Sequence, residues 1–145
     1  MARNLSYTFL GDDIMANDIG IRTTLNLSFE QAIQKTTDAL KAEGFGVLTQ
    51  IDMQATLKQK LNVDFRRYVI LGACNPPLAH RAFSANLDVG LLLPCNVTVY
   101  EEGDRSVVTA VDPVEMLGVL KEDPGAHEVA VEARTRLQHV ISSLK

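Results

Sequence analysis

Residues 67–77, RYVILGACNPP, contain a strand-to-helix junction. The first eight are nearly all apolar, which predicts a strand buried on both faces. Asn75 then offers a side-chain oxygen suited to an N-cap, and Pro76 suits the first helical position because its missing N–H would be unpaired there anyway. A helix is therefore predicted from Pro76 to about Asn86. Its inner face is expected to carry Leu78, Ala79, Ala82 and Phe83.

The segment before this junction predicts two strands and two helices. Residues 21–26 are rich in β-formers, and residues 45–51 form a second strand pattern. Between them, Ser28 and Gln31 have the spacing of a capping box, and Gly44 suits the left-handed end of the helix. A short amphipathic helix with Asp52 as its N-cap is expected after the second strand.

The segment after the junction predicts a hairpin and further helices. Residues 89–101 and 106–111 are expected to be antiparallel strands joined by a turn at residues 102–104. Pro94 donates no backbone hydrogen bond, so it marks an edge or a bulge in the first of these strands. Asp112-Pro113 and Asp123-Pro124 repeat the helix-start signal.

This order of elements favours the α+β class, with helices packed on one face of a mainly antiparallel, curved sheet. Residues 19–145 are expected to form a single domain. Residues 1–18 differ, because Leu5, Tyr7 and Phe9 alternate with polar residues as in a short strand. They form either a partly ordered tail or a strand that pairs with a sheet edge, including that of a second subunit.

The composition of the 145 residues excludes several classes. Hydrophobic residues make up 46% and the net charge is −4, which rules out disorder over the whole chain. The mild negative charge argues against nucleic acid or an anionic membrane as the main partner. No segment has the roughly 20 apolar residues of a membrane span, and the N-terminus lacks a signal-peptide pattern, so a cytoplasmic location is expected.

The two cysteines are the most informative residues for chemistry. Cys74 ends the predicted strand just before the N-cap, where the positive end of a helix favours a thiolate of lowered pKa. The alternative is a small apolar core residue. Cys95 shares its parity with apolar residues and is expected on the core face, unless a bulge at Pro94 re-aims it.

These residues suggest one small pocket. Cys74-Asn75 and Cys95-Asn96 each lie beside a proline at a break in a strand, so both pairs could line the same site. Two thiols that meet there would suit a redox pair or a soft metal. His80 and Arg81 are expected on the solvated side of their helix, where they would become contacts only if a ligand or a second subunit covered it. No cofactor is indicated, because the nucleotide-binding and hydrolase motifs are missing.

Four segments together resemble a known family. They are residues 44–49 (GFGVLT), 71–76 (LGACNP), 92–97 (LLPCNV) and 111–113 (VDP). In this order and spacing the chain resembles the bacterial and archaeal domain of unknown function family number 302, over about residues 19–120. The resemblance implies a TATA-box-binding-protein-like α+β fold, usually met as a homodimer, and no settled activity. The family's characteristic positions include Cys74, Asn75, Pro76, Cys95 and Asn96.

Three hypotheses for function follow. The first is a cytoplasmic homodimer that binds a small ligand or soft metal near Cys74 and Cys95, with Asn75, Asn96, His80 and Arg81 as further contacts. The second is a thiol-based redox protein or enzyme with Cys74 as the nucleophile. The third is a purely structural or partner-binding domain in which both cysteines are core residues.

Overall fold

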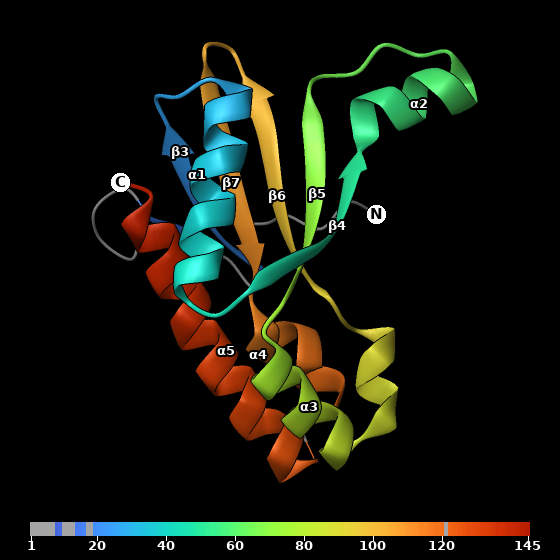
Figure 1. Ribbon diagram of the computed structural model, residues 1–145, viewed down its shortest axis with the longest axis vertical. Coiled ribbons are helices and arrows are strands. Elements are labelled where there is room, and N and C mark those ends of the chain that lie inside the picture. Colours follow the sequence, from blue (N-terminus) through green and yellow to red (C-terminus); the bar gives the residue numbers. More distant parts are fainter. Residues whose placement is uncertain (1–7, 10–13, 17–18, 121) are drawn as a thin grey trace.

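The computed structural model describes residues 8–9, 14–16, 19–120 and 122–145. These residues form an antiparallel sheet in the order β1-β2-β3-β7-β6-β5-β4, with helices beside it (Figure 1). The strands are β1 (Thr8–Phe9), β2 (Met15–Ala16), β3 (Gly20–Leu25), β4 (Gly46–Asp52), β5 (Tyr68–Cys74), β6 (Cys95–Glu102) and β7 (Arg105–Val111). The helices are α1 (Phe29–Ala42), α2 (Met53–Leu61), α3 (Pro76–Ala85), α4 (Pro113–Met116) and α5 (Pro124–Ser143), with 3₁₀ turns η1 (Leu87–Leu91) and η2 (Leu117–Leu120).

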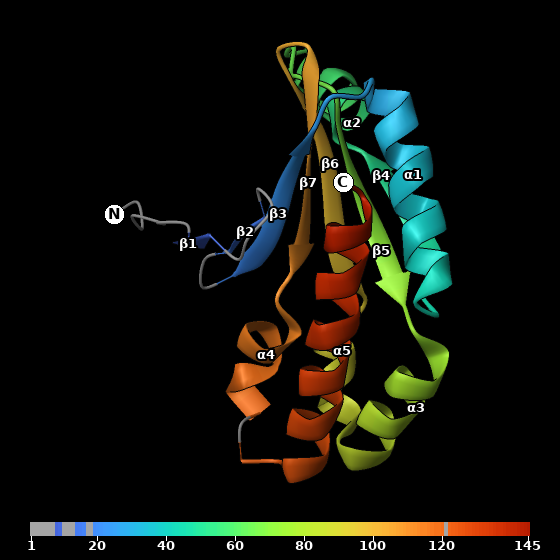
Figure 2. The same ribbon diagram turned by 90° about the vertical axis from the view of Figure 1, so that its left-hand side faces the viewer.

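Helices α1 and α5 lie on one face of the sheet, and its other face is left without a helix (Figure 2). This arrangement confirms the predicted α+β class. Helix α5 extends beyond the end of the sheet, where α3 and α4 pack beside it (Figure 1). The molecule therefore has a sheet-and-helix part and an all-helical part that share α5.

Each part has its own hydrophobic cluster. The larger cluster fills the space between the sheet and helices α1 and α5, with Leu40, Leu71, Val97 and Leu137 fully buried in it. The smaller cluster joins α3, η1 and α5 through Leu78, Ala82, Val89, Val129 and Ala133. Leu93 packs against both clusters. The junction between the two cores thus lies beside the Leu93-Pro94-Cys95 segment.

The helix-start signals in the sequence are confirmed by the structure. The hydroxyl of Ser28 accepts from the Gln31 backbone, and the Gln31 side chain returns the bond to Ser28. Gly44 has φ +84°, a left-handed conformation that glycine adopts without a Cβ clash. Asn75, Asp112 and Asp123 each cap a helix whose first residue is proline.

Three details of the sequence-based expectation are wrong. Residues 87–91 form the 3₁₀ turn η1, so β6 begins only at Cys95 and not at Val89. Strand β5 is buried on one face only, because Tyr68 and Ile70 are half-exposed on the face that no helix covers. Phe83 is 39% exposed, since α3 buries only the narrow stripe of Leu78 and Ala82.

The N-terminal strand expectation is only partly covered by the structure. Thr8 and Phe9 form β1, which pairs with β2, and β2 pairs with β3 of the same chain. Leu5 and Tyr7, which belong to the same predicted pattern, lie outside the described residues. Among the helices of the described part, none is long and apolar enough to cross a bilayer.

Candidate functional site

A small, largely apolar cavity of about 40 Å³ lies where the two hydrophobic clusters meet. The end of β5 and the start of α3 form one wall, and the segment from Leu93 to Cys95 forms another. Side chains of α4, η2 and α5 close the remaining sides. The lining includes Phe45, Leu78, Ala82, Leu117, Val129 and Ala133.

Both cysteines line this cavity. Cys95 begins β6 and is directly opposite Ala73, the neighbour of Cys74 on β5. The Cys95 side chain is buried, whereas Cys74 is partly accessible, and both thiols are free. The strand pairing therefore brings together two sulfur atoms that lie 21 positions apart in the sequence.

The surroundings of the two thiols oppose ionisation. Burial raises the pKa of Cys95 to about 11, and the neighbouring Cys74 adds to the rise. Burial also raises the pKa of Cys74. The expectation of a Cys74 thiolate with a lowered pKa is thus wrong, which removes the main support for an activated nucleophile at this position.

The first turn of α3 explains why the helix start does not activate Cys74. Pro76 and Pro77 carry no N–H, and the N–H of Leu78 already donates to Asn75 Oδ1 at 3.2 Å. None of these three residues offers a free amide to a thiolate. The amide groups that usually create the positive end of a helix are therefore missing or already bonded.

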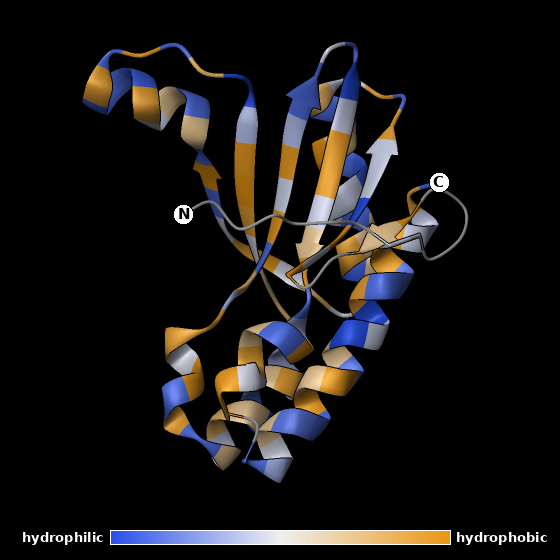
Figure 3. Ribbon diagram, turned by 180° about the vertical axis from the view of Figure 1, so that it is seen from behind, coloured by the Kyte–Doolittle hydropathy of each residue, from blue (hydrophilic) through white to orange (hydrophobic). Residues whose placement is uncertain are grey.

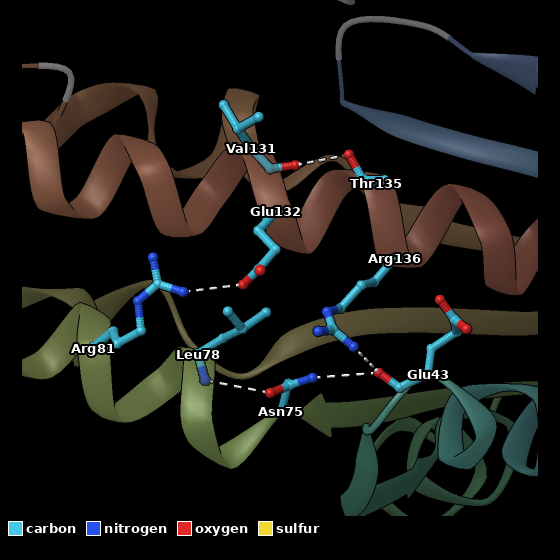
Figure 4. A network of polar contacts seen from close by, with 8 residues as sticks. All are labelled: Glu43, Asn75, Leu78, Arg81, Val131, Glu132, Thr135 and Arg136. Carbon is cyan, nitrogen blue, oxygen red and sulfur yellow. Dashed lines mark hydrogen bonds and ion pairs between the residues drawn. The ribbon is translucent and has the colours of Figure 1, made fainter.

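Asn75 connects three elements around the cavity (Figure 4). Its side-chain oxygen caps α3, and its amide nitrogen donates to the carbonyl of Glu43 at 3.3 Å, just after α1. Arg136 of α5 donates to the same carbonyl at 3.2 Å. A Cβ added at Gly44 would lie 2.9 Å from the Asn75 amide nitrogen, so glycine leaves room for this contact.

A second close approach shapes the wall beside Cys95. A Cβ added at Gly72 would overlap the Thr49 hydroxyl and would lie 2.8 Å from Cγ of Pro94. The Leu93–Pro94 peptide is cis, and both residues line the cavity. Glycine at position 72 therefore lets the Pro94 ring lie against β5 next to the two thiols.

Three other predicted site residues do not reach the cavity. His80 is exposed on α3, and Arg81, also exposed, pairs with Glu132 at 3.1 Å. Asn96 is exposed on the opposite face of the sheet from Cys95, because successive strand residues point to opposite faces. The grouping of these residues with the cysteines was wrong for that reason.

The sequence reasoning missed the residues that hold the site from a distance. Glu43 and Arg136 are 93 positions apart and meet only because α1 and α5 pack on the same sheet face. Local spacing carries no signal for such a contact. Leu78 was expected on the inner face of α3, but nothing in the sequence placed it beside Cys95.

The donor set in the cavity is narrow. Among the described residues there is no group of three or more His, Cys, Asp or Glu side chains that could hold a metal ion. Two thiols alone match the preference of a soft ion such as Cu(I) for sulfur ligands. Asn75 has both of its side-chain polar atoms in protein hydrogen bonds, so it positions Cys74 instead of acting as a ligand.

The raised pKa values predict how the thiols react with iodoacetamide. With Cys95→Ala protein, which reports on Cys74 alone, we expect the alkylation rate to keep rising with pH through pH 9, because only the thiolate reacts. With Cys74→Ala protein, we expect Cys95 to stay unmodified until the protein is unfolded in urea. A Cys74 rate that reaches a plateau below pH 8 would contradict this and restore the nucleophile hypothesis.

Comparison with known proteins gives a family and no activity. The chain matches the family model described as Domain of unknown function DUF302 over residues 21–144. It is similar to the crystal structure of an uncharacterized conserved DUF302 protein from Bacillus stearothermophilus, with 31% identity and a TM-score of 0.80, over 87% of this chain and 98% of that chain. No curated protein matches it. The chain therefore belongs to the DUF302 family.

Proposed function

We propose that this protein is a homodimer that binds a soft metal ion, or a ligand of similar size, between Cys74 and Cys95. The observation that carries the proposal is that both thiols of the chain line one apolar cavity. The two free thiols also suit a reducing compartment such as the cytoplasm.

The size of the cavity limits the ligand. Pockets for small organic molecules usually measure roughly 300–1,000 Å³, and a single water needs roughly 10–15 Å³. At about 40 Å³ the cavity has room for an ion or a few atoms, and not for a drug-sized molecule or a haem. The size therefore favours the soft-metal form of the hypothesis over the small-organic-ligand form.

The chemistry of the lining favours a soft ion. Sulfur ligands select Cu(I) and related ions over Mg²⁺ or Ca²⁺, which need several oxygen ligands. Binding requires both thiols to lose their protons, and the pKa of each free thiol is raised. Protons therefore compete with the ion, and affinity should fall as the pH falls.

A separate observation supports the homodimer. The edge arm, defined as residues 46–65, consists of β4, α2 and the loop that follows, and Figure 1 shows α2 projecting from the body. No residue of α2 is buried, although isolated helices shorter than about 12 residues are marginal in water. The large apolar side chains exposed along the edge arm are Leu48, Ile51, Leu61, Val63 and Phe65.

A second copy of the chain is the partner that fits this arm. Strand β4 is the outermost strand on its side of the sheet and contains no Lys, Arg or Pro, the residues that commonly protect such edges. The same strand of a second copy can pair with it antiparallel across a two-fold axis, because an isologous interface uses the same surface twice. We therefore assign the dimer contact to the edge arm.

Metal titration tests the cavity. Reduced, chelator-free protein is titrated anaerobically with Cu(I) and, separately, with Cd(II), whose thiolate bonds are followed by ultraviolet absorption. We expect one ion per chain, no stoichiometric binding by Cys74→Ser or Cys95→Ser, and weaker binding at lower pH. His80→Gln, which removes an imidazole outside the cavity, should bind as wild type does.

Two results would overturn the metal proposal. The first is wild-type protein that binds neither ion, which would leave the cysteines as packing residues. The second is single-cysteine variants that keep full affinity, which would place the ion elsewhere.

Light scattering tests the edge arm. We expect twice the 15.9 kDa chain mass for the wild type and the monomer mass for Leu61→Glu at the same concentration, because a buried charge at an apolar contact is costly. Leu87→Glu is the matched control, since Leu87 is 81% exposed and Leu61 is 66% exposed. A monomeric wild type would refute the dimer. Loss of the dimer in Leu87→Glu alone would refute the assigned surface.

A further inference from the structure

The face of the sheet opposite α1 and α5 carries a second and larger hollow (Figure 3). This open-face groove measures about 310 Å³, against about 40 Å³ for the cysteine cavity. It therefore reaches the lower end of the size range of small-molecule pockets. Its polar and aromatic lining residues are Arg22, Tyr68, Asn96, Thr98, Tyr100 and Thr109.

Two tyrosines form an aromatic wall in this groove. Tyr68 of β5 is directly opposite Tyr100 of β6 in the strand register. Their ring centroids are 5.4 Å apart and their planes differ by 2°. Because a stacked aromatic pair presents a flat surface with little freedom of movement, a planar ligand can pack against it at low entropic cost.

Two arginines lie against the same ring. The Arg22 guanidinium carbon is 5.9 Å from the centre of the Tyr100 ring and its Nη2 donates to the Tyr100 hydroxyl. The Arg66 guanidinium carbon is 5.6 Å from the same ring centre. Among the described residues, Arg66 forms no ion pair with a carboxylate. The adjacent Arg67 differs, because it pairs with Glu30 on the helix-covered side.

The groove is therefore positive, although the whole chain carries a net charge of −4. In the described part of the chain, no Asp or Glu lines it, and the remaining polar groups are the amide of Asn96 and the hydroxyls of Thr98 and Thr109. Guanidinium groups form bidentate bonds with carboxylate and phosphate, and an anion between the two arginines would relieve their mutual repulsion.

We propose that the open-face groove binds a small planar anion, an aromatic ring that bears a carboxylate or a phosphate. Arg22 and Arg66 take the anionic group, and the ring packs against Tyr68 and Tyr100. The groove lies on the other face of the sheet from Cys95, so this site does not depend on the proposed metal site.

Three naphthalene probes test the charge and the source of the anion. The chain has no tryptophan, so naphthalene fluorescence can be followed without interference from the protein. We expect 2-naphthoate or 2-naphthyl phosphate to bind, and the stronger of the two to identify the anionic group. Neutral 2-naphthamide should bind more weakly, and added salt should weaken only the anions.

Matched arginine variants locate the site. We expect Arg66→Gln to weaken binding of the preferred anion roughly tenfold, because a cation beside an aromatic ring is removed. Arg81→Gln, an equivalent change at an exposed arginine outside the groove, should leave binding unchanged. Tyr68→Leu should weaken binding of all three probes.

Three outcomes would overturn the proposal. One is equal binding of 2-naphthamide and the anions, and another is no binding of any probe at millimolar concentration. The third is a change of molecular mass in Arg66→Gln without a change in probe affinity, which would make this face a subunit interface.

Discussion

The hydrogen bonds of Asn75 are the constraint on which the rest of the structure depends. This side chain caps α3, donates to the end of α1 through the Glu43 carbonyl, and shares that carbonyl with Arg136 of α5. It therefore fixes the direction in which the chain leaves β5 after Cys74. Because an unpaired buried amide costs about 1–3 kcal/mol, α1 and α3 are held in one relative position. That position leaves a small cavity between the two hydrophobic clusters, with Cys74 and Cys95 on its wall.

The two faces of the sheet have different chemistry for a simple geometric reason. Successive residues of a strand point to opposite faces, so Cys95 and Val97 enter the core while Asn96, Thr98 and Tyr100 line the open face. The helix-covered side offers thiols in an apolar cavity too small for an organic ligand. The open side offers tyrosines and arginines in a groove large enough for one. Two binding surfaces with different ligand classes thus come from one strand.

Local signals in the sequence predicted much of the fold, whereas the site depends on contacts between distant residues. Ser28-Gln31, Asn75-Pro76 and Asp123-Pro124 satisfy backbone groups within one helical turn, so their effect does not depend on the rest of the chain. Residues 89–93 were misassigned to a strand because Val89, Leu91 and Leu93 alternate as strand residues do, although Leu91 is 85% exposed and only Val89 of η1 is buried. The pKa of Cys74 was misjudged because burial and the two prolines of α3 outweigh the helix field. The Glu43–Arg136 contact has no local signal.

The stability and thiol protection of Asn75→Ala protein test this account most directly, with Asn86→Ala as the matched control. Both asparagines cap a helical turn, but Asn75 also bonds Glu43 across the fold. We predict that urea unfolding shows a loss of about 2–3 kcal/mol for Asn75→Ala and about 1 kcal/mol or less for Asn86→Ala. Cys95 should also become reactive towards iodoacetamide in folded Asn75→Ala protein and stay protected in Asn86→Ala. Equal losses in the two variants, with Cys95 protected in both, would contradict the role assigned to Asn75.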